Sequence, residues 1–227
     1  MRSVPIADLG AFEQWSKTLP GNCLVDRDAF LLSLARGKSV VHLGAANSPY
    51  HKQDAERGEM LHQKLQPVAG RLVGIDSDAE AVAWLREHHQ IQNIRAADVC
   101  SPVLDLGKFD LILCCDIIEH VSDTASLLRG IKPLMNGDSR LVVTTINALS
   151  MKPALRALLG REAVHPDHVS YYSFSTLGSL LLRHGFRPVE YATFAYGTVS
   201  RLTGAACAAM YRIAPSLADG ILIIAQL

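Results

Sequence analysis

The sequence predicts an α/β fold: a doubly wound, mostly parallel sheet of roughly seven strands, with helices on both faces and an antiparallel strand at one edge. Three observations support this prediction. The chain has 227 residues, of which 49% are hydrophobic and 19% charged, so it can bury a full core. Short apolar runs alternate with helical patterns, as in βα units. Acidic residues close several of these runs, at the sheet edge where ligands bind.

The first 37 residues are predicted to form a helical cap. Apolar side chains recur every three positions at Ile6, Leu9, Phe12 and Trp15, and a second helical pattern stops at Gly37. Residues 38–227 then form the core. Because no repeat or low-complexity linker divides the chain, we expect one domain over residues 1–227.

The core alternates between strand-like and helix-like segments, which predicts parallel strands joined by crossover helices. The expected strands are residues 39–44, 71–76, 93–98, 109–116 and 140–147, and the intervening helical patterns are residues 55–66, 78–89 and 123–134. The tail departs from this rhythm. It reads as a helix (174–185), a strand (186–194), an Ala-rich helix (202–213) and a final strand (220–226), with the last two strands antiparallel at the sheet edge.

Composition narrows the range of partners. Lys plus Arg and Asp plus Glu each total 22, so no global positive field favours nucleic acid or an anionic membrane. The first twenty residues lack the apolar core of a secretory signal, and no apolar stretch reaches the roughly 20 residues of a membrane helix. We therefore expect a cytoplasmic protein with no nucleic-acid or membrane partner. A homo-oligomer is left open.

The turn after the first core strand, residues 43–50, is the first candidate for ligand binding. Gly44 lets the backbone approach a ligand closely, but Ala46 and Ser48 stand where a glycine-rich pattern would place further glycines. An ordinary glycine turn at a strand end explains this segment equally well.

Three acids follow successive strands. Asp76 suits the two vicinal hydroxyls of a ribose, and Asp78 or Ser77 can cap the next helix in its place. Asp98 could accept the amine of an adenine ring, or could be a solvated loop carboxylate. Asp116 reaches the same edge at the end of the fourth strand, and three such acids favour a common ligand.

In this order, the strings VVHLGAANS, VGIDSDAEAV, AADV, FDLILCCDIIEHVSD, LMNGDSRLVVTTIN and HVSYYSFSTLGSLLLRHGF resemble the class I S-adenosylmethionine (SAM)-dependent methyltransferases, which are Rossmann-like. The resemblance covers residues 39–194. It implies that the first turn lies against the methionine part of SAM, that the second-strand acid binds ribose, that the third-strand acid binds adenine, and that the fourth-strand end faces the methyl group. By position, the implied cofactor-binding residues are Gly44, Ala45, Asp76, Ser77, Asp98, Val99 and Cys115.

Two features depart from the family pattern. His42 stands where members usually carry an acid before the glycine turn, and two of three glycines in that turn are missing. The segments HLGAANSPYH, MLHQKL and HPDHVSYYS also resemble a subgroup that methylates sugars and polysaccharides. This resemblance implies a small-molecule or glycan acceptor.

Methyl transfer to a hydroxyl needs an acceptor for its proton. The segment DIIEH is predicted to start a helix, so that Asp116 and Glu119 share a face flanked by His120. It resembles the DxxEH segment of quinone-pathway O-methyltransferases, which bind a divalent cation. These three residues would suit Mg²⁺ or Mn²⁺ as an optional metal, or they could simply fix a helix N-terminus.

The segment HPDHV supplies a second candidate for the proton acceptor. His165 and His168 flank Asp167 in a loop that this fold places over the substrate opening, and imidazole titrates near neutral pH. We favour His168 over His165 as the base, because Pro166 restricts the backbone of His165. Asp116 is the third expected catalytic residue. Packing could explain either histidine alone. Tyr171 and Tyr172 follow, and one of them could stack on a sugar ring.

The sequence thus predicts a SAM-dependent O-methyltransferase acting on a hydroxyl of a sugar, glycan or similar polar molecule. Two alternatives remain. The altered glycine turn could mark a non-catalytic scaffold that binds SAM or a partner. An NAD(P)-dependent oxidoreductase is disfavoured, because the turn lacks the glycines that admit a pyrophosphate.

Overall fold

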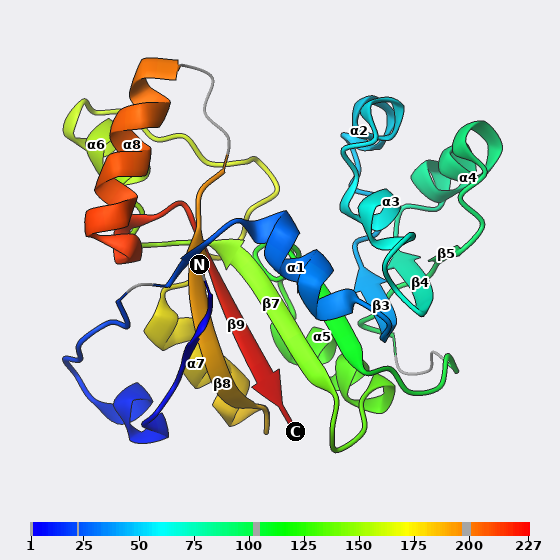
Figure 1. Ribbon diagram of the computed structural model, residues 1–227, viewed down its shortest axis with the longest axis horizontal. Helices are drawn as coiled ribbons and strands as arrows, with labels where there is room; N and C mark the ends of the chain where they lie inside the picture. The colour runs from blue at the N-terminus through cyan, green and yellow to red at the C-terminus, as the bar shows by residue number, and fades with distance from the viewer. Residues whose placement is uncertain (1, 22, 102–104, 197–200) are drawn as a thin grey trace.

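The computed structural model describes residues 2–21, 23–101, 105–196 and 201–227, and it contains a nine-stranded sheet with helices on both faces (Figure 1). The strand order is β1-β8-β9-β7-β6-β3-β4-β5, and β2 pairs with β8. The strands are β1 (Val4–Pro5), β2 (Leu24–Val25), β3 (Ser39–Leu43), β4 (Arg71–Asp76), β5 (Ile94–Ala96), β6 (Leu111–Cys115), β7 (Arg140–Ile146), β8 (Arg187–Phe194) and β9 (Gly220–Gln226).

The sheet reverses its order between β3 and β6. From β3 the chain adds β4 and then β5 on one side, and from β6 it adds β7 on the other, all in parallel. The carboxyl ends of β3 and β6 therefore border the crevice where doubly wound sheets bind ligands. The predicted doubly wound α/β fold is confirmed, and β3 to β9 are the roughly seven strands expected.

The antiparallel strand β9 lies inside the sheet, whereas the two-residue β1, antiparallel to β8, lies at the edge. Strand β9 pairs with β7 on one side and β8 on the other. Its residues are buried almost throughout, whereas β8 begins with the exposed Arg187 and carries the half-buried Glu190. The more apolar strand takes the covered position, which sequence alternation could not rank.

Helices cover both faces of the sheet. Figure 1 shows α1 in front of the sheet and α5 and α7 behind it. Neighbouring residues of β6 serve opposite cores: Ile112 belongs to the cluster with α5 and α7, and Leu113 to the cluster with α1 and α3. The helices are α1 (Arg27–Ala35), α2 (His51–Arg57), α3 (Leu61–Leu65), α4 (Ala79–His89), α5 (Thr124–Ile131), α6 (Met151–Leu158), α7 (Phe174–Arg183) and α8 (Arg201–Ile213), with 3₁₀ turns η1 (Leu9–Glu13), η2 (Lys132–Leu134) and η3 (Pro215–Leu217).

The expected helical cap over residues 1–37 is only partly helical. Residues 9–13 form the short η1, and α1 is the one α-helix in the described part of this segment. The strands β1 and β2 instead join the sheet beside β8. Phe12 packs into the core while Trp15 is fully exposed, so the three-residue spacing extends through a single 3₁₀ turn and no further.

Among the helices that the structure describes, none combines the length and the apolar character needed to cross a bilayer.

Candidate active site

A cavity of about 600 Å³ opens at the carboxyl ends of β3, β4 and β6, where the strand order reverses. The loops after these strands, the start of α1 and the segment around residue 165 supply its wall. Five of the seven residues implied for cofactor binding line it, namely Gly44, Ala45, Asp76, Ser77 and Cys115.

The glycine turn has one strict requirement. Gly44 adopts a φ of 69°, and a Cβ built on it would meet the Ile117 side chain at 2.9 Å. Its backbone N–H and that of Ala45 both donate to the carbonyl of Ile75. Ala46 is buried beside Ala45 in the core cluster that includes residues of α2 and α4. The turn therefore keeps its shape with a single glycine.

Asp76 sits at the end of β4 and closes this turn. Its carboxylate accepts a 2.8 Å hydrogen bond from the N–H of Ala46 and a 2.9 Å bond from the N–H of Asp78. Asp78 caps α4 with its own side chain, as expected, and also accepts from the hydroxyl of Ser48. Each oxygen of Asp76 keeps a second lone pair for a ligand in the cavity.

Asp98 and Val99 are placed differently. Neither residue belongs to the part of the cavity wall that the structure describes. The Asp98 carboxylate is exposed and accepts from the backbone N–H of Cys100, and Val99 is buried against Gly130. Their predicted adenine contact stays a prediction, and the local geometry matches the solvated-loop alternative.

His42 is buried below the glycine turn and lines the cavity. Its Nδ1 lies 3.4 Å from Nδ1 of the fully buried His62, whose Nε2 lies 3.1 Å from Oδ1 of Asn93. The Asn93 amide donates to the carbonyl of Leu72, which leaves its oxygen to accept from His62. Nδ1 of His62 is then an acceptor for the Nδ1–H of His42, so Nε2 of His42 carries a lone pair.

Burial keeps this histidine pair neutral. It lowers the pKa of His62 to about 4 and the pKa of His42 well below its usual value, with the neighbouring ring lowering the latter further. Gly74 makes the arrangement possible, because a Cβ there would meet Cε1 of His62 at 2.8 Å. At the position where the family resemblance implies an acid, this chain presents a neutral hydrogen-bond acceptor.

Asp116, at the end of β6, is held in an ion pair. Its Oδ2 lies 2.8 Å from the guanidinium of Arg27, and its Oδ1 accepts from the hydroxyls of Thr144 and Tyr196. Burial lowers the pKa of Arg27, but the carboxylate of Asp116 together with the other acidic groups around the guanidinium raises it by more. Both oxygens of Asp116 thus have partners within the protein, and its expected catalytic role stays a prediction. Cys115 beside it stays a thiol, because burial raises its pKa to about 12.

The expected metal ligands Asp116, Glu119 and His120 do not converge. Asp116 has a φ of 53°, and residues 117–120 form a turn instead of the first turn of a helix; α5 starts only at Thr124. The i, i+3 relation of a helix is therefore lost. Glu119 is 1% exposed with one carboxyl oxygen unpaired, and burial together with Asp116 raises its pKa to about 7.

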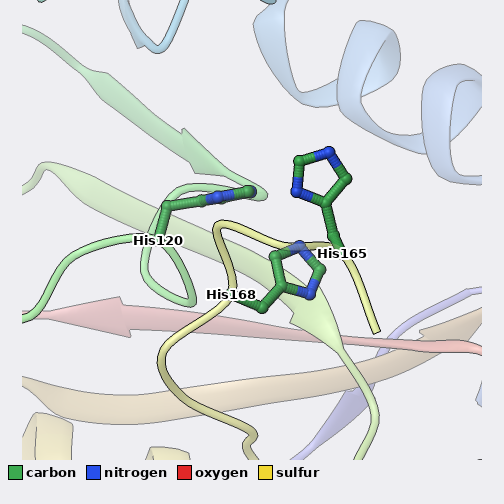
Figure 2. A group of neighbouring side chains, drawn as sticks. All are labelled: His120, His165 and His168. Atoms are coloured by element: carbon green, nitrogen blue, oxygen red, sulfur yellow. The ribbon is translucent and has the colours of Figure 1, made fainter. Parts of the chain in front are cut away.

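The structure instead brings together three histidines. One nitrogen of each of His120, His165 and His168 lies within 4.8 Å of the others. Figure 2 shows the three rings pointing toward one another, with His120 on the turn after β6 and the other two on the loop after α6. Burial lowers the pKa of His120 and of His168, and the neighbouring imidazoles lower both further.

A second, smaller cavity of about 190 Å³ adjoins this cluster. His165 and His168 line both cavities, and α6 contributes Lys152 and Arg156 to the smaller one. Tyr171 lines it as well, whereas Tyr172 is buried in the core. The histidines therefore stand between two binding spaces.

Sequence reasoning missed several groups of this site. Arg27 and Tyr196 come from segments distant in sequence, and only the folded chain brings them to the carboxyl edge. The helix α6 is also absent from the elements that the sequence predicts, none of which lies between residues 147 and 174. One signal could have pointed to Arg27: a cation in the first turn of a helix opposes the helix dipole and so needs an acidic partner.

The comparisons agree with this arrangement. A family model described as a methyltransferase domain matches residues 28–191. The ubiquinone biosynthesis O-methyltransferase of Glaesserella parasuis serovar 5 (strain SH0165) is 27% identical over 137 residues, which cover 56% of this chain and 53% of that protein. The chain spans about half the length of the curated relatives it matches.

Two solved structures share the fold. A SAM-dependent methyltransferase from Mesorhizobium loti has a TM-score of 0.55 at 18% identity, covering 87% of this chain and 96% of that chain. The N-methyltransferase NodS from Bradyrhizobium japonicum WM9, in complex with S-adenosyl-L-homocysteine, has a TM-score of 0.53 at 16% identity, covering 88% and 85%.

A doubly wound sheet with a polar cavity at its point of reversal, closed by a strand-ending acid, defines a nucleotide-cofactor protein of the Rossmann-like class. The family match is more specific. The chain belongs to the methyltransferase domain family and so to the SAM-dependent methyltransferases, as the sequence predicted. The sugar-methylating subgroup stays a prediction.

Proposed function

We propose that the protein binds SAM in the larger cavity and transfers its methyl group to a hydroxyl of a sugar, glycan or similar polar small molecule in the smaller one. The observation that carries this proposal is the pair His165 and His168, which lines both cavities. Because the two cavities adjoin at these histidines, a methyl donor in one and a hydroxyl in the other would be neighbours, as an in-line methyl transfer requires.

The cofactor side supplies matched polar groups. The free lone pairs of Asp76 suit the ribose hydroxyls. Nε2 of His42 suits a donor such as the ammonium of the methionine part, close to the turn at Gly44. Cys115 borders the methyl end as a neutral thiol.

The reaction needs alignment and a place for one proton. A lone pair of the acceptor oxygen forms the new C–O bond while the C–S bond breaks and its electrons return to sulfur, and the hydroxyl proton passes to a base. His168 fits this role best. Its Nδ1 is buried without a partner, whereas Nδ1 of His165 accepts from the N–H of Asp167 and Nε2 of His165 lies 3.5 Å from the hydroxyl of Tyr50.

The polar wall of the smaller cavity favours a polar acceptor. Arg156 and Tyr171 line it, together with Lys152, which is ion-paired with Asp219. An aromatic side chain beside a guanidinium suits a sugar ring with an anionic substituent. Asp116 contributes by position, because it anchors Arg27 and Tyr196 at the edge of the cavity.

A phenolic hydroxyl on an apolar molecule is the second candidate acceptor. The relatives named ubiquinone biosynthesis O-methyltransferases motivate it. So do Leu155 and Leu158, which are exposed on α6 beside the smaller cavity.

Calorimetry and a transfer assay test the proposal. We expect the protein to bind S-adenosylhomocysteine in preference to NADH, and to transfer a ³H-methyl group to a sugar-containing acceptor from a panel of sugars, catechols, quinols and amines. His168→Ala should lower the rate by roughly 10²–10⁴-fold, while cofactor affinity stays unchanged. The matched control is His184→Ala, at the C-terminal end of α7.

Three outcomes would count against this assignment. Preference for NADH would contradict SAM as the cofactor. Transfer only to amines would contradict a hydroxyl as the acceptor. Cofactor binding without transfer to any acceptor would favour the non-catalytic scaffold. Full activity in the His165→Ala/His168→Ala double variant would remove the loop histidines as bases.

A further inference from the structure

The cluster of His120, His165 and His168 has the composition of a metal site. In the described part of the chain it is the one group of three or more His, Cys, Asp or Glu side chains whose donor atoms converge. His120 comes from one loop and the other two from another, so a bound ion would join the two loops (Figure 2).

We propose that His120, His165 and His168 bind a divalent transition-metal ion of the Zn²⁺ type. Imidazole nitrogens suit Zn²⁺, Cu²⁺, Fe²⁺ and Ni²⁺ better than Mg²⁺ or Mn²⁺, which prefer oxygen. Three histidines with one position left open are typical of catalytic zinc sites. This site replaces the Mg²⁺ or Mn²⁺ site expected at Asp116, Glu119 and His120, of which it keeps only His120.

The geometry requires little movement. Tetrahedral ligands at 2.0–2.1 Å from an ion lie about 3.3 Å apart, so nitrogens within 4.8 Å of one another need only rotate inward by about 1 Å. Surface loops can follow such a shift. His168 and His165 are already held together by a 3.0 Å backbone hydrogen bond from the N–H of His168 to the carbonyl of His165.

One further feature points to a ligand at this place. Nδ1 of His168 is buried without a hydrogen-bond partner, although buried polar atoms are nearly always paired. Asp167 lies beside His165: its backbone N–H donates to Nδ1 of that ring, and its carboxylate lies 3.8 Å from the same nitrogen. Carboxylates close to metal-binding histidines commonly orient them.

The cluster also has a suggestive position. An ion placed here would lie on the wall shared by the two cavities.

The catalytic consequence rests on the proposed function, whereas metal binding itself does not. The open position would receive the acceptor oxygen and lower the pKa of its hydroxyl, so that the proton leaves to solvent. The oxygen then forms its bond to the methyl carbon as the C–S bond breaks. His168 would serve as a ligand in this state and not as the base.

Direct binding tests the site. Protein freed of metal with EDTA should bind one Co²⁺ with the intense visible absorption of a tetrahedral site and without the near-ultraviolet band of thiolate ligands, and Zn²⁺ should displace it. His120→Ala, His165→Ala and His168→Ala should each weaken Co²⁺ binding by at least 10-fold, since even the loss of an orienting partner costs 10–100-fold. His184→Ala should bind as the parent does.

The outcomes separate the two proposals. No Co²⁺ binding by the parent, or equal binding by the triple variant with a normal circular dichroism spectrum, would exclude the metal site. Calorimetry of the metal-free protein with S-adenosylhomocysteine tests the cofactor independently. Methyl transfer that is lost with EDTA and restored by Zn²⁺ supports the metal role, whereas transfer unaffected by EDTA supports His168 as base and overturns it.

Discussion

The carboxylate of Asp76 is the group on which cofactor affinity should depend most. It faces the cavity and also fixes the glycine turn through the N–H of Ala46. Replacement by alanine removes a charged acceptor from the ribose and leaves that N–H without its partner. Hydrogen bonds to charged groups contribute about 1.5–3 kcal/mol each.

We therefore expect Asp76→Ala to weaken S-adenosylhomocysteine binding by at least about 10-fold, measured by calorimetry. Asp138→Ala is the matched control, because Asp138 lies in the exposed turn before β7, at the opposite edge of the sheet. Unchanged affinity in Asp76→Ala would remove this carboxylate from the binding site.

Single residues could be predicted from the sequence where a strand end fixes their position. Gly44, Asp76 and Cys115 each close a strand of the parallel core, so their placement at the carboxyl edge followed from topology. The partners of Asp116 could not be predicted this way. Arg27 and Tyr196 are 89 and 80 residues away from it, and no local pattern couples such positions.

The ion pair between Arg27 and Asp116 fastens α1 to the end of β6. Both side chains are largely covered, at 20% and 27% exposure, so removing one partner leaves the other without compensation. A second ion pair, between Lys64 and Asp28, also involves the first turn of α1. Its side chains are more exposed, at 33% and 32%.

We expect Arg27→Met to lower the free energy of unfolding by roughly 3 kcal/mol, measured by urea titration. The double variant Arg27→Met/Asp116→Asn should cost less than the sum of the two single changes, with a coupling above about 1 kcal/mol. Lys64→Met, the matched control, should cost under about 1 kcal/mol. Additive single changes would show that the pair does not hold the helix in place.

Helices could be predicted from the sequence where a periodic apolar pattern and a capping residue occur together. Segments with strong periodicity and a cap were well predicted: the α7 helix begins after a Ser173 capping box, and Asp78 caps α4. The segment DIIEH was wrongly predicted as helical. Asp116 adopts a positive φ, and Asp123 caps the next helix, so that α5 begins only at Thr124. The helix α6 buries none of its residues, so it is not part of the core that the sequence pattern predicts.

The order of the strands in the sheet shows what sequence can fix for the whole molecule. Alternating βα units determine parallel pairing and helices on both faces. They do not predict which of β8 and β9 lies inside the sheet, because that depends on how fully each strand is buried in the folded protein. Likewise, the clustering of His120 with the HPDHV loop depends on how two distant loops fold over one edge.

The buried pair of His42 and His62 should make the stability of the whole protein depend on pH. Both pKa values are lower in the folded protein than the ordinary value of about 6.5, so the unfolded chain binds more protons below that pH. Stability is therefore fully present above about pH 6.5 and is lost as the pH falls toward 4, the folded pKa of His62. Each histidine contributes a slope of about 1.4 kcal/mol per pH unit across this window.

We expect the free energy of unfolding, measured by urea titration between pH 7.5 and pH 5, to fall with a steeper slope in the parent than in His42→Gln/His62→Gln. Glutamine keeps a donor and an acceptor in each position but does not titrate, so this variant should lose up to about 2.8 kcal/mol per pH unit of the parent's dependence below pH 6.5. His88→Gln, on the exposed face of α4, is the matched control and should leave the slope unchanged. Equal slopes in the parent and the double variant would mean that the pair is protonated in the folded protein, and that His42 does not offer the cofactor a neutral acceptor.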